Sequence, residues 1–289
     1  MDGDRSSSIG LRGEPLRDVK LRFSGDGFDM LGWGIVWLVS FLAFSIPMAW
    51  WERSFRRWLA RKVNPDDGSV FTFDGSPKEI WYWFPPLGIL DLMRGQVHDP
   101  VFRPLLGIVS LLLGAWVSWV VIRWFTKGLR LRGSIGFRFT GSPRTYIGLQ
   151  VLSAASVFTV VGWPWVQVAI QRWVYRHMES DDAELQWVGK PLELLGLGFL
   201  FFVLPLLLIL LVSGLTLSDM GTMLLSWFSP ATGFDFDKIH HANVIGLFIL
   251  WGTWMPWFMT WMFRWYIRNT KLLVKESAIV AEPVEAPAE

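Results

Sequence analysis

Five long apolar runs constrain the fold of this chain more than any other feature of its sequence. They are Phe28–Trp51, Pro104–Phe125, Tyr146–Ile170, Leu192–Val212 and Asn243–Phe263. A helix needs about 20 apolar residues to cross a hydrocarbon core about 30 Å thick, and each run reaches that length. We therefore predict an all-α integral membrane protein with about five transmembrane helices. The mean hydropathy of +0.35 agrees with this class.

The predicted helical membrane domain covers residues 28–275 and has a polar segment on either side. Residues 1–27 lack the apolar core that marks a signal peptide. Residues 276–289 are rich in Ala, Pro and Glu, a composition that is too polar to pack, so we expect a disordered acidic tail. The run Ile80–Met93 is too short to cross and contains Asp91, and we expect it to be interfacial or re-entrant.

One pattern of Trp and Arg occurs three times at the expected ends of helices. It is a Trp, an Arg-Trp pair seven and eight residues later, and an Arg eleven residues after the first Trp. The copies are Trp50, Arg57-Trp58, Arg61; Trp165, Arg172-Trp173, Arg176; and Trp257, Arg264-Trp265, Arg268. On a helix, the positions seven and eleven residues after the first Trp lie within about 20° of it, so the first Trp and the two Arg residues form one stripe. Trp favours the membrane interface and Arg reaches phosphate, so we predict contact with anionic lipid headgroups or a membrane-protein partner.

A second motif, an aromatic residue two positions before a Gly and preceded by a short alternating apolar stretch, occurs four times. The copies are Phe23–Gly25, Phe73–Gly75, Phe139–Gly141 and Trp187–Gly189. Alternating apolar residues before each copy predict a short strand, and the Gly is expected to supply a turn.

At four places the Gly of one motif and the first Trp of the other are separated by 24 or 25 residues. Residues 21–125 and 137–213 are therefore interpreted as two copies of one unit of strand, helix, strand and helix, with an insertion in the first copy. A final helix over residues 243–268 follows.

The distribution of basic residues leaves the topology open. Cytoplasmic segments carry an excess of Lys and Arg, which favours a cytoplasmic position for Arg53–Lys62 and Arg264–Lys275. Five simple spans place both there but put the basic segment Lys127–Arg144 outside. If the first half of each repeat were re-entrant, every basic segment would be cytoplasmic.

Several kinds of chemistry find no support in the sequence. The chain has no Cys and a net charge of only +2, with its basic residues beside the apolar runs, so we expect no thiolate site and no nucleic-acid binding. His240 and His241 follow Asp235 and Asp237, but their spacing matches no metal motif. No phosphate loop or nucleophile elbow is present. We predict no cofactor, no metal and no enzymatic activity.

The second unit contains the segments FRFTGSPRTYIGL, TVVGWPWVQVAIQRWVYRHM and LQWVGKPLELLGL. In these segments the chain resembles the YjgN-like family of uncharacterised bacterial inner-membrane proteins. The matching residues are Thr159, Gly162, Pro164, Trp165, Arg172 and Trp173. The first unit matches more loosely, because Ala49 stands where the family has Pro. The resemblance covers about two thirds of the chain and implies a helical protein of the bacterial inner membrane, with no implied activity or catalytic residue.

Together these features predict a non-enzymatic accessory or organising subunit that binds lipid or a membrane-protein partner. The alternative is a transporter or channel, in which Asp91 or the segment Ile80–Arg103 acts as a gate. A membrane enzyme would need His240, His241 and Asp235 gathered in one pocket.

Overall fold

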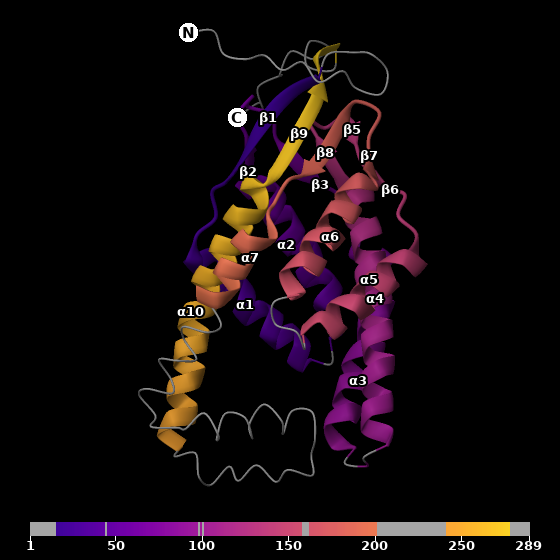
Figure 1. Ribbon diagram of the computed structural model, residues 1–289, viewed down its shortest axis with the longest axis vertical. Helices are drawn as coiled ribbons and strands as arrows, with labels where there is room; N and C mark the ends of the chain where they lie inside the picture. Colours follow the sequence, from indigo (N-terminus) through magenta and orange to yellow (C-terminus); the bar gives the residue numbers. More distant parts are fainter. Residues whose placement is uncertain are drawn as a thin grey trace.

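The computed structural model describes residues 16–43, 45–97, 99, 101–157, 162–200 and 241–277. Five features of the sequence lie outside these residues: Thr159, the second half of Leu192–Val212, Asp235, His240 and the tail from residue 278 onward. The strands gather at one end of the molecule, and pairs of helices extend from them toward the other end (Figure 1).

Four units succeed one another along the chain, each with an aromatic-x-Gly motif followed by two described helices, and in the first three units the two helices pack as a hairpin. They span residues 23–62, 73–128, 139–177 and 187–269. Their helices are α1 (Gly27–Leu42) and α2 (Met48–Lys62); α3 (Phe84–Gln96) and α4 (Phe102–Gly128); α5 (Pro143–Ser156) and α6 (Trp163–Arg176); and α7 (Pro191–Gly198) and α10 (His241–Arg268). Two short 3-10 turns, η1 (Pro77–Glu79) and η2 (Trp81–Trp83), precede α3. The interpreted repeat over residues 21–125 thus comprises two of these units.

The same hydrogen bond closes the base of every unit. The backbone N–H of the central motif residue donates to a carbonyl oxygen at the end of the second helix. The pairs are Ser24 to Lys62 at 2.9 Å, Asp74 to Gly128 at 3.0 Å, Thr140 to His177 at 2.9 Å and Val188 to Asn269 at 2.9 Å. The donor precedes the first helix of the unit and the acceptor lies at the end of the second helix. The chain therefore returns to the strands in each unit.

The prediction of five transmembrane helices is wrong. Within the described residues, one helix, α4, is long and apolar enough to cross a membrane. The run Phe28–Trp51 breaks between α1 and α2, where Ser45 has a left-handed φ of 58°. Tyr146–Ile170 likewise breaks between α5 and α6. The 16 residues of α1 extend only about 24 Å, which is less than the bilayer core of about 30 Å.

Two antiparallel sheets also contradict the all-α prediction. One has the order β2-β1-β9-β8-β7-β6 and the other β3-β4-β5. The strands are β1 (Leu16–Phe23), β2 (Val63–Pro65), β3 (Phe71–Phe73), β4 (Leu129–Leu131), β5 (Ile135–Gly136), β6 (Arg138–Phe139), β7 (Met178–Glu179), β8 (Ala183–Trp187) and β9 (Thr270–Lys275). The four short strands predicted before the aromatic-x-Gly motifs are confirmed, because β1, β3, β6 and β8 each end at the aromatic residue of a motif.

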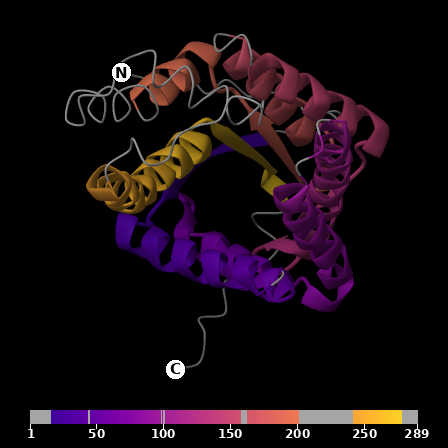
Figure 2. The ribbon, with the colours of Figure 1, turned by 90° about the horizontal axis from the view of Figure 1, so that it is seen from below.

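The four units close into a ring (Figure 2). The last strand, β9, lies between β1 and β8, with Leu16 opposite Lys275 and Trp187 opposite Thr270. Helix α10 packs against α1, so the fourth unit contacts the first. The side chains of Val19, Leu272 and Val274 are fully buried in the core beneath this sheet. The closed ring therefore depends on residues near both ends of the described chain.

The four motif glycines have a packing role instead of the expected turn. None has a left-handed φ. In each unit the aromatic ring two residues earlier lies against the Gly Cα and meets the Trp of the Arg-Trp pair edge-on. The ring centroids are 5.9 Å apart for Phe23 and Trp58, 4.9 Å for Phe73 and Trp124, 5.8 Å for Phe139 and Trp173, and 5.4 Å for Trp187 and Trp265.

Replacing Gly141 by Ala should lower the free energy of unfolding by about 1–3 kcal/mol, as overpacked cores do. A Cβ there would lie 2.5 Å from Phe139 Cζ and 2.6 Å from Trp173 Cη2, so both rings would have to move. Gly148 is the matched control, because a Cβ in that helix meets nothing within 4 Å. Urea titration should show Gly148→Ala neutral or more stable by up to about 1 kcal/mol. Equal stability of the two variants would contradict this packing role.

Candidate functional site

The predicted Trp and Arg residues lie on the outward face of the second helix in each hairpin. Leu59, Val174 and Tyr266, nine residues after the first Trp and so about 180° away on the helix, belong to the buried core or pack against it. Trp50, Trp165 and Trp257 are 46%, 44% and 46% exposed. All six predicted arginines are exposed as well: Arg57, Arg61, Arg172, Arg176, Arg264 and Arg268. We call each set of first Trp and two cations a Trp/Arg stripe.

The structure contains a fourth stripe that the sequence analysis missed. Trp116, Arg123 and Lys127 lie on α4 at the same spacing, and Trp124 follows Arg123 as in the other copies. The copy differs by a Lys at its last position and by partial burial of Trp116. A search that allowed Lys for Arg would have found it.

Three of the four stripes also join their unit to the next one around the ring. Arg57 Nε donates to Phe73 O at 3.1 Å, Arg172 Nη2 to Gly189 O at 3.2 Å and Arg264 Nη2 to Gly25 O at 3.3 Å. In the second unit Trp119 Nε1 takes this role and donates to Gly141 O at 2.9 Å. Arg57, Arg172 and Arg264 therefore each use one N–H group in a junction between units and have further N–H groups that can bind another partner.

Large apolar side chains are exposed on the halves of the hairpins that lie away from the strands. They include Ile35, Val36, Leu38 and Val39 of α1, Ile89 and Leu92 of α3, Leu105 and Ile108 of α4, and Val151 and Leu152 of α5. Large apolar side chains exposed together in one part of a molecule mark contact with a membrane or another protein. The first Arg of each stripe lies within the last six residues of its helix, next to the strands.

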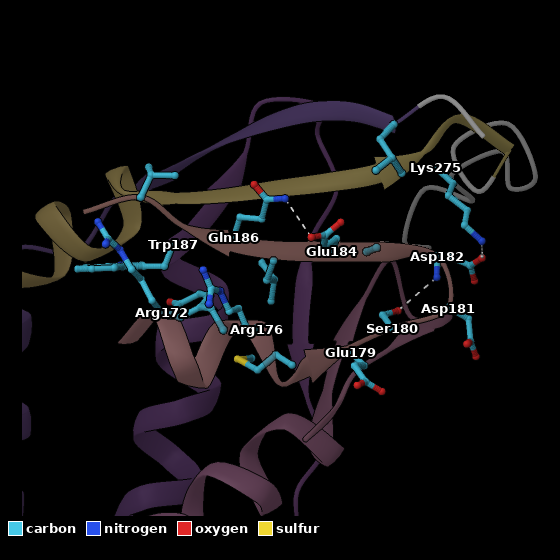
Figure 3. A pocket seen from close by; sticks show the side chains of 16 residues that line it. Arg172, Arg176, Glu179, Ser180, Asp181, Asp182, Glu184, Gln186, Trp187 and Lys275 are labelled. Atoms are coloured by element: carbon cyan, nitrogen blue, oxygen red, sulfur yellow. Dashed lines mark hydrogen bonds and ion pairs between the residues drawn. The ribbon is translucent and has the colours of Figure 1, made fainter. Parts of the chain in front are cut away.

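A cavity of about 800 Å³ lies beside the third stripe. Arg172 and Arg176 enter it from α6, while β8 and the turn between β7 and β8 form its other sides (Figure 3). Met178 and Leu185 supply apolar surface, and acidic residues line the turn. The cavity therefore has cationic, anionic and apolar surfaces.

The other candidates from the sequence do not form a site in the described residues. Asp91 lies exposed on α3 and accepts a hydrogen bond from Ser110 Oγ at 2.8 Å. Among the residues that the structure describes, no group of three His, Asp or Glu could hold a metal ion. Asp235 and His240 lie outside these residues, and His241 begins α10.

No protein-family model, curated protein or solved structure matches this chain.

Proposed function

We propose that this protein is a non-enzymatic component of a bacterial inner membrane that binds anionic lipid headgroups through its Trp/Arg stripes. The observation that carries this proposal is a repeated arrangement in which an exposed Trp and exposed cations share one face of a helix, with the cations nearer the strands. Seven residues of helix separate the Trp from the first Arg by about 10 Å along the axis. This spacing suits a Trp at the hydrocarbon boundary and an Arg at lipid phosphate.

The surface of α4 supports insertion of the hairpins into a bilayer. Only 17% of the most apolar 18-residue stretch of α4 is buried, whereas the core helix of a globular protein would be mostly buried. The helix begins at Phe102, far from the position of a signal sequence. In this arrangement the hairpin tips enter the bilayer and the strands stay at its surface.

The transporter alternative has one observation in its favour. Glu52 and Arg56 pair at 2.9 Å on the face of α2 opposite the stripe, with side chains only 15% and 27% exposed. Charges placed among apolar helices often mark a transport path. Ion flux in protein-containing vesicles would favour this alternative over lipid binding.

Replacing Arg57, Arg172 and Arg264 together by Gln should weaken the preference for anionic lipid by at least tenfold. Each cation near an anionic surface contributes about 1 kcal/mol, so three removals are sufficient for that change. The protein would be placed in nanodiscs of equal phosphatidylglycerol and phosphatidylcholine, and the lipids retained after transfer to detergent would be measured by mass spectrometry.

Two control variants separate charge at the stripe from total charge and from folding. Arg17, Arg22 and Arg138 are exposed on strands, and their replacement by Gln removes equal charge outside the stripes. The corresponding Lys triple at the stripe positions keeps the charge and should keep the lipid preference. An unchanged phosphatidylglycerol enrichment in the Gln triple would reject the proposal.

A further inference from the structure

Four charged side chains that line the cavity have no ionic partner among the described residues, and they divide equally between the two signs. Arg172 donates to a neutral backbone carbonyl at 3.2 Å, and Arg176 makes no hydrogen bond or ion pair with a described residue. The carboxylate of Asp181 makes none there either, and Glu184 accepts a hydrogen bond from the neutral amide of Gln186 at 2.9 Å. Two positive and two negative charges are therefore available to a ligand.

The remaining charges of the lining are already paired. Glu179 pairs with Arg138 at 3.4 Å and accepts a hydrogen bond from Thr140 Oγ1 at 3.0 Å. Asp182 pairs with Lys275 at 3.7 Å. These pairs leave the four charges described above uncompensated, so the cavity combines a positive region with a negative region.

The two regions lie at different ends of the cavity. Figure 3 shows Arg172 and Arg176 at the α6 end, with Glu184 nearer the turn between β7 and β8 and Asp181 on that turn. Along β8, the three residue steps from Glu184 to Trp187 extend about 10 Å. A ligand that satisfies both ends therefore carries an anionic group and a cationic group a short distance apart.

The negative region suits a primary ammonium group better than a quaternary one. A primary ammonium donates three hydrogen bonds, and the carboxylates of Asp181 and Glu184 together with the hydroxyl of Ser180 can accept them. Quaternary ammonium groups are recognised instead by aromatic cages. The aromatic residues of the lining, Tyr175 and Trp187, belong to α6 and to the far end of β8. The lining near the turn therefore favours a cation that has N–H donors.

The positive region suits a phosphate group. Two guanidinium groups one helical turn apart present planar forks of N–H donors, which match the oxygen atoms of phosphate. In the proposed function, Trp165 of this stripe lies at the hydrocarbon boundary and Arg172 at lipid phosphate. The order from the hairpin tip toward the strands is then Trp165, Arg172 and Glu184. An ethanolamine phospholipid has the same order of hydrocarbon, phosphate and ammonium.

We propose that the cavity binds a phosphoethanolamine group, as in the headgroup of an ethanolamine phospholipid, with its phosphate at Arg172 and Arg176 and its ammonium at Glu184 and Asp181. Such binding rests on the lipid contact proposed for the third stripe and adds the identity of the headgroup. The volume of about 800 Å³ lies within the range of about 300–1,000 Å³ that ligand sites occupy. A headgroup bound in this way places a charge of the opposite sign at each end of the cavity.

Loss of the two unpaired carboxylates should remove the preference for phosphatidylethanolamine. The protein would be placed in nanodiscs of equal phosphatidylethanolamine, phosphatidylglycerol and phosphatidylcholine, and the lipids retained in neutral detergent would be measured by mass spectrometry. The parent protein should enrich phosphatidylethanolamine over phosphatidylcholine. D181N/E184Q should lower this enrichment at least tenfold, because hydrogen bonds between charged groups are lost, without lowering the enrichment of phosphatidylglycerol. R172Q/R176Q, which removes the phosphate contacts, should also lower the enrichment of phosphatidylethanolamine at least tenfold.

E179Q/D182N is the matched control. It removes the same two charges by the same kinds of substitution from the same cavity, but from carboxylates that already pair with Arg138 and Lys275. It should change the enrichment of phosphatidylethanolamine less than threefold. An equal loss of enrichment in E179Q/D182N and D181N/E184Q would show a response to total charge and would overturn the proposal.

A soluble compound separates a lipid from a free ligand. Glycerophosphoethanolamine would be titrated by calorimetry into the protein held in nanodiscs of phosphatidylcholine. Saturable binding that D181N/E184Q weakens at least tenfold would assign the site to a free phosphoethanolamine compound. Retention of phosphatidylethanolamine that depends on the same carboxylates, without such binding, would assign the site to a lipid headgroup.

The phosphoethanolamine site and the anionic-lipid function can fail separately. If the soluble compound does not bind and phosphatidylethanolamine enrichment is absent, or is equal in the parent and D181N/E184Q, the phosphoethanolamine site is rejected. Failure of the anionic-lipid function would appear instead as unchanged phosphatidylglycerol enrichment when Arg57, Arg172 and Arg264 are replaced by Gln.

Discussion

Replacing Val274 by Asp is expected to lower the free energy of unfolding by more than about 4 kcal/mol and to leave little folded protein. Val274 is fully buried in β9, between Arg17 of β1 and Ala183 of β8. A carboxylate at this position would lose its hydration without gaining a partner, which costs several kcal/mol. Since natural domains are stable by only about 5–15 kcal/mol, this loss removes a large share of the total.

Lys271→Asp is the control on the same strand. Lys271 is exposed, so an aspartate there keeps its water and should change the free energy of unfolding by no more than about 0.5 kcal/mol. Urea titration monitored by far-ultraviolet circular dichroism would compare the two variants in one detergent. If Val274→Asp remained within about 1 kcal/mol of the parent protein, β9 would not be part of the cooperative core.

Asp67→Asn should have the second largest effect, a loss of about 2–3 kcal/mol. Asp67 Oδ2 accepts a hydrogen bond from Arg132 Nη2 at 2.7 Å, and the two side chains are only 3% and 15% exposed. Asp67 Oδ1 also accepts from Ser69 N at 2.9 Å and Ser69 Oγ at 2.6 Å. These bonds join the loop between β2 and β3 to the turn after β4. Asp74→Asn, at an exposed carboxylate, is the control and should be nearly neutral.

The same pair predicts how stability depends on pH. Burial raises the pKa of Asp67, but the hydrogen bonds from Ser69 and Arg132 together lower it by a larger amount. The pKa of Asp67 therefore falls below its ordinary value of 3.8. The stabilisation by this carboxylate is therefore complete above pH 3.8 and is lost as pH falls through the lowered pKa. Unfolding free energies measured from about pH 6 down to pH 2.5 should fall less steeply for Asp67→Asn. Parallel curves for variant and parent would contradict the role of this pair.

The short strands and the Trp/Arg spacing could be predicted from sequence because both are local patterns. The hairpin turns could not, because a window of 20 residues averages hydropathy and does not detect a reversal of the chain. In Phe28–Trp51 that reversal occupies only a few residues, with Ser45 in a left-handed conformation. The re-entrant alternative for the first half of each repeat was closer to the observed hairpins than the simple spans.

The parts of the site that depend on contacts between residues distant in the sequence could not be predicted from the sequence. The glycines of the aromatic-x-Gly motifs looked like turn residues, whereas they accommodate rings that pack against a Trp from a helix end far along the chain. No strand was predicted for Thr270–Lys275, which was noted only as part of the basic segment Arg264–Lys275, although its pairing with β1 and β8 makes it the strand that joins the fourth unit to the first. The cavity depends on where β7 leaves β8, which is set by tertiary packing.

Because β1 and β9 lie side by side, the order of the four units around the ring is independent of where the chain starts. A circular permutant that began at Ile135, ran to Lys275 and continued through a linker into Leu16 would contain the same units as neighbours. Its new ends would fall at the turn before β5, where Gly133 has nothing within 4 Å of a Cβ position. In this architecture the contact between β1 and β9 is one junction among several, and the ring could be opened at another junction without changing its internal contacts.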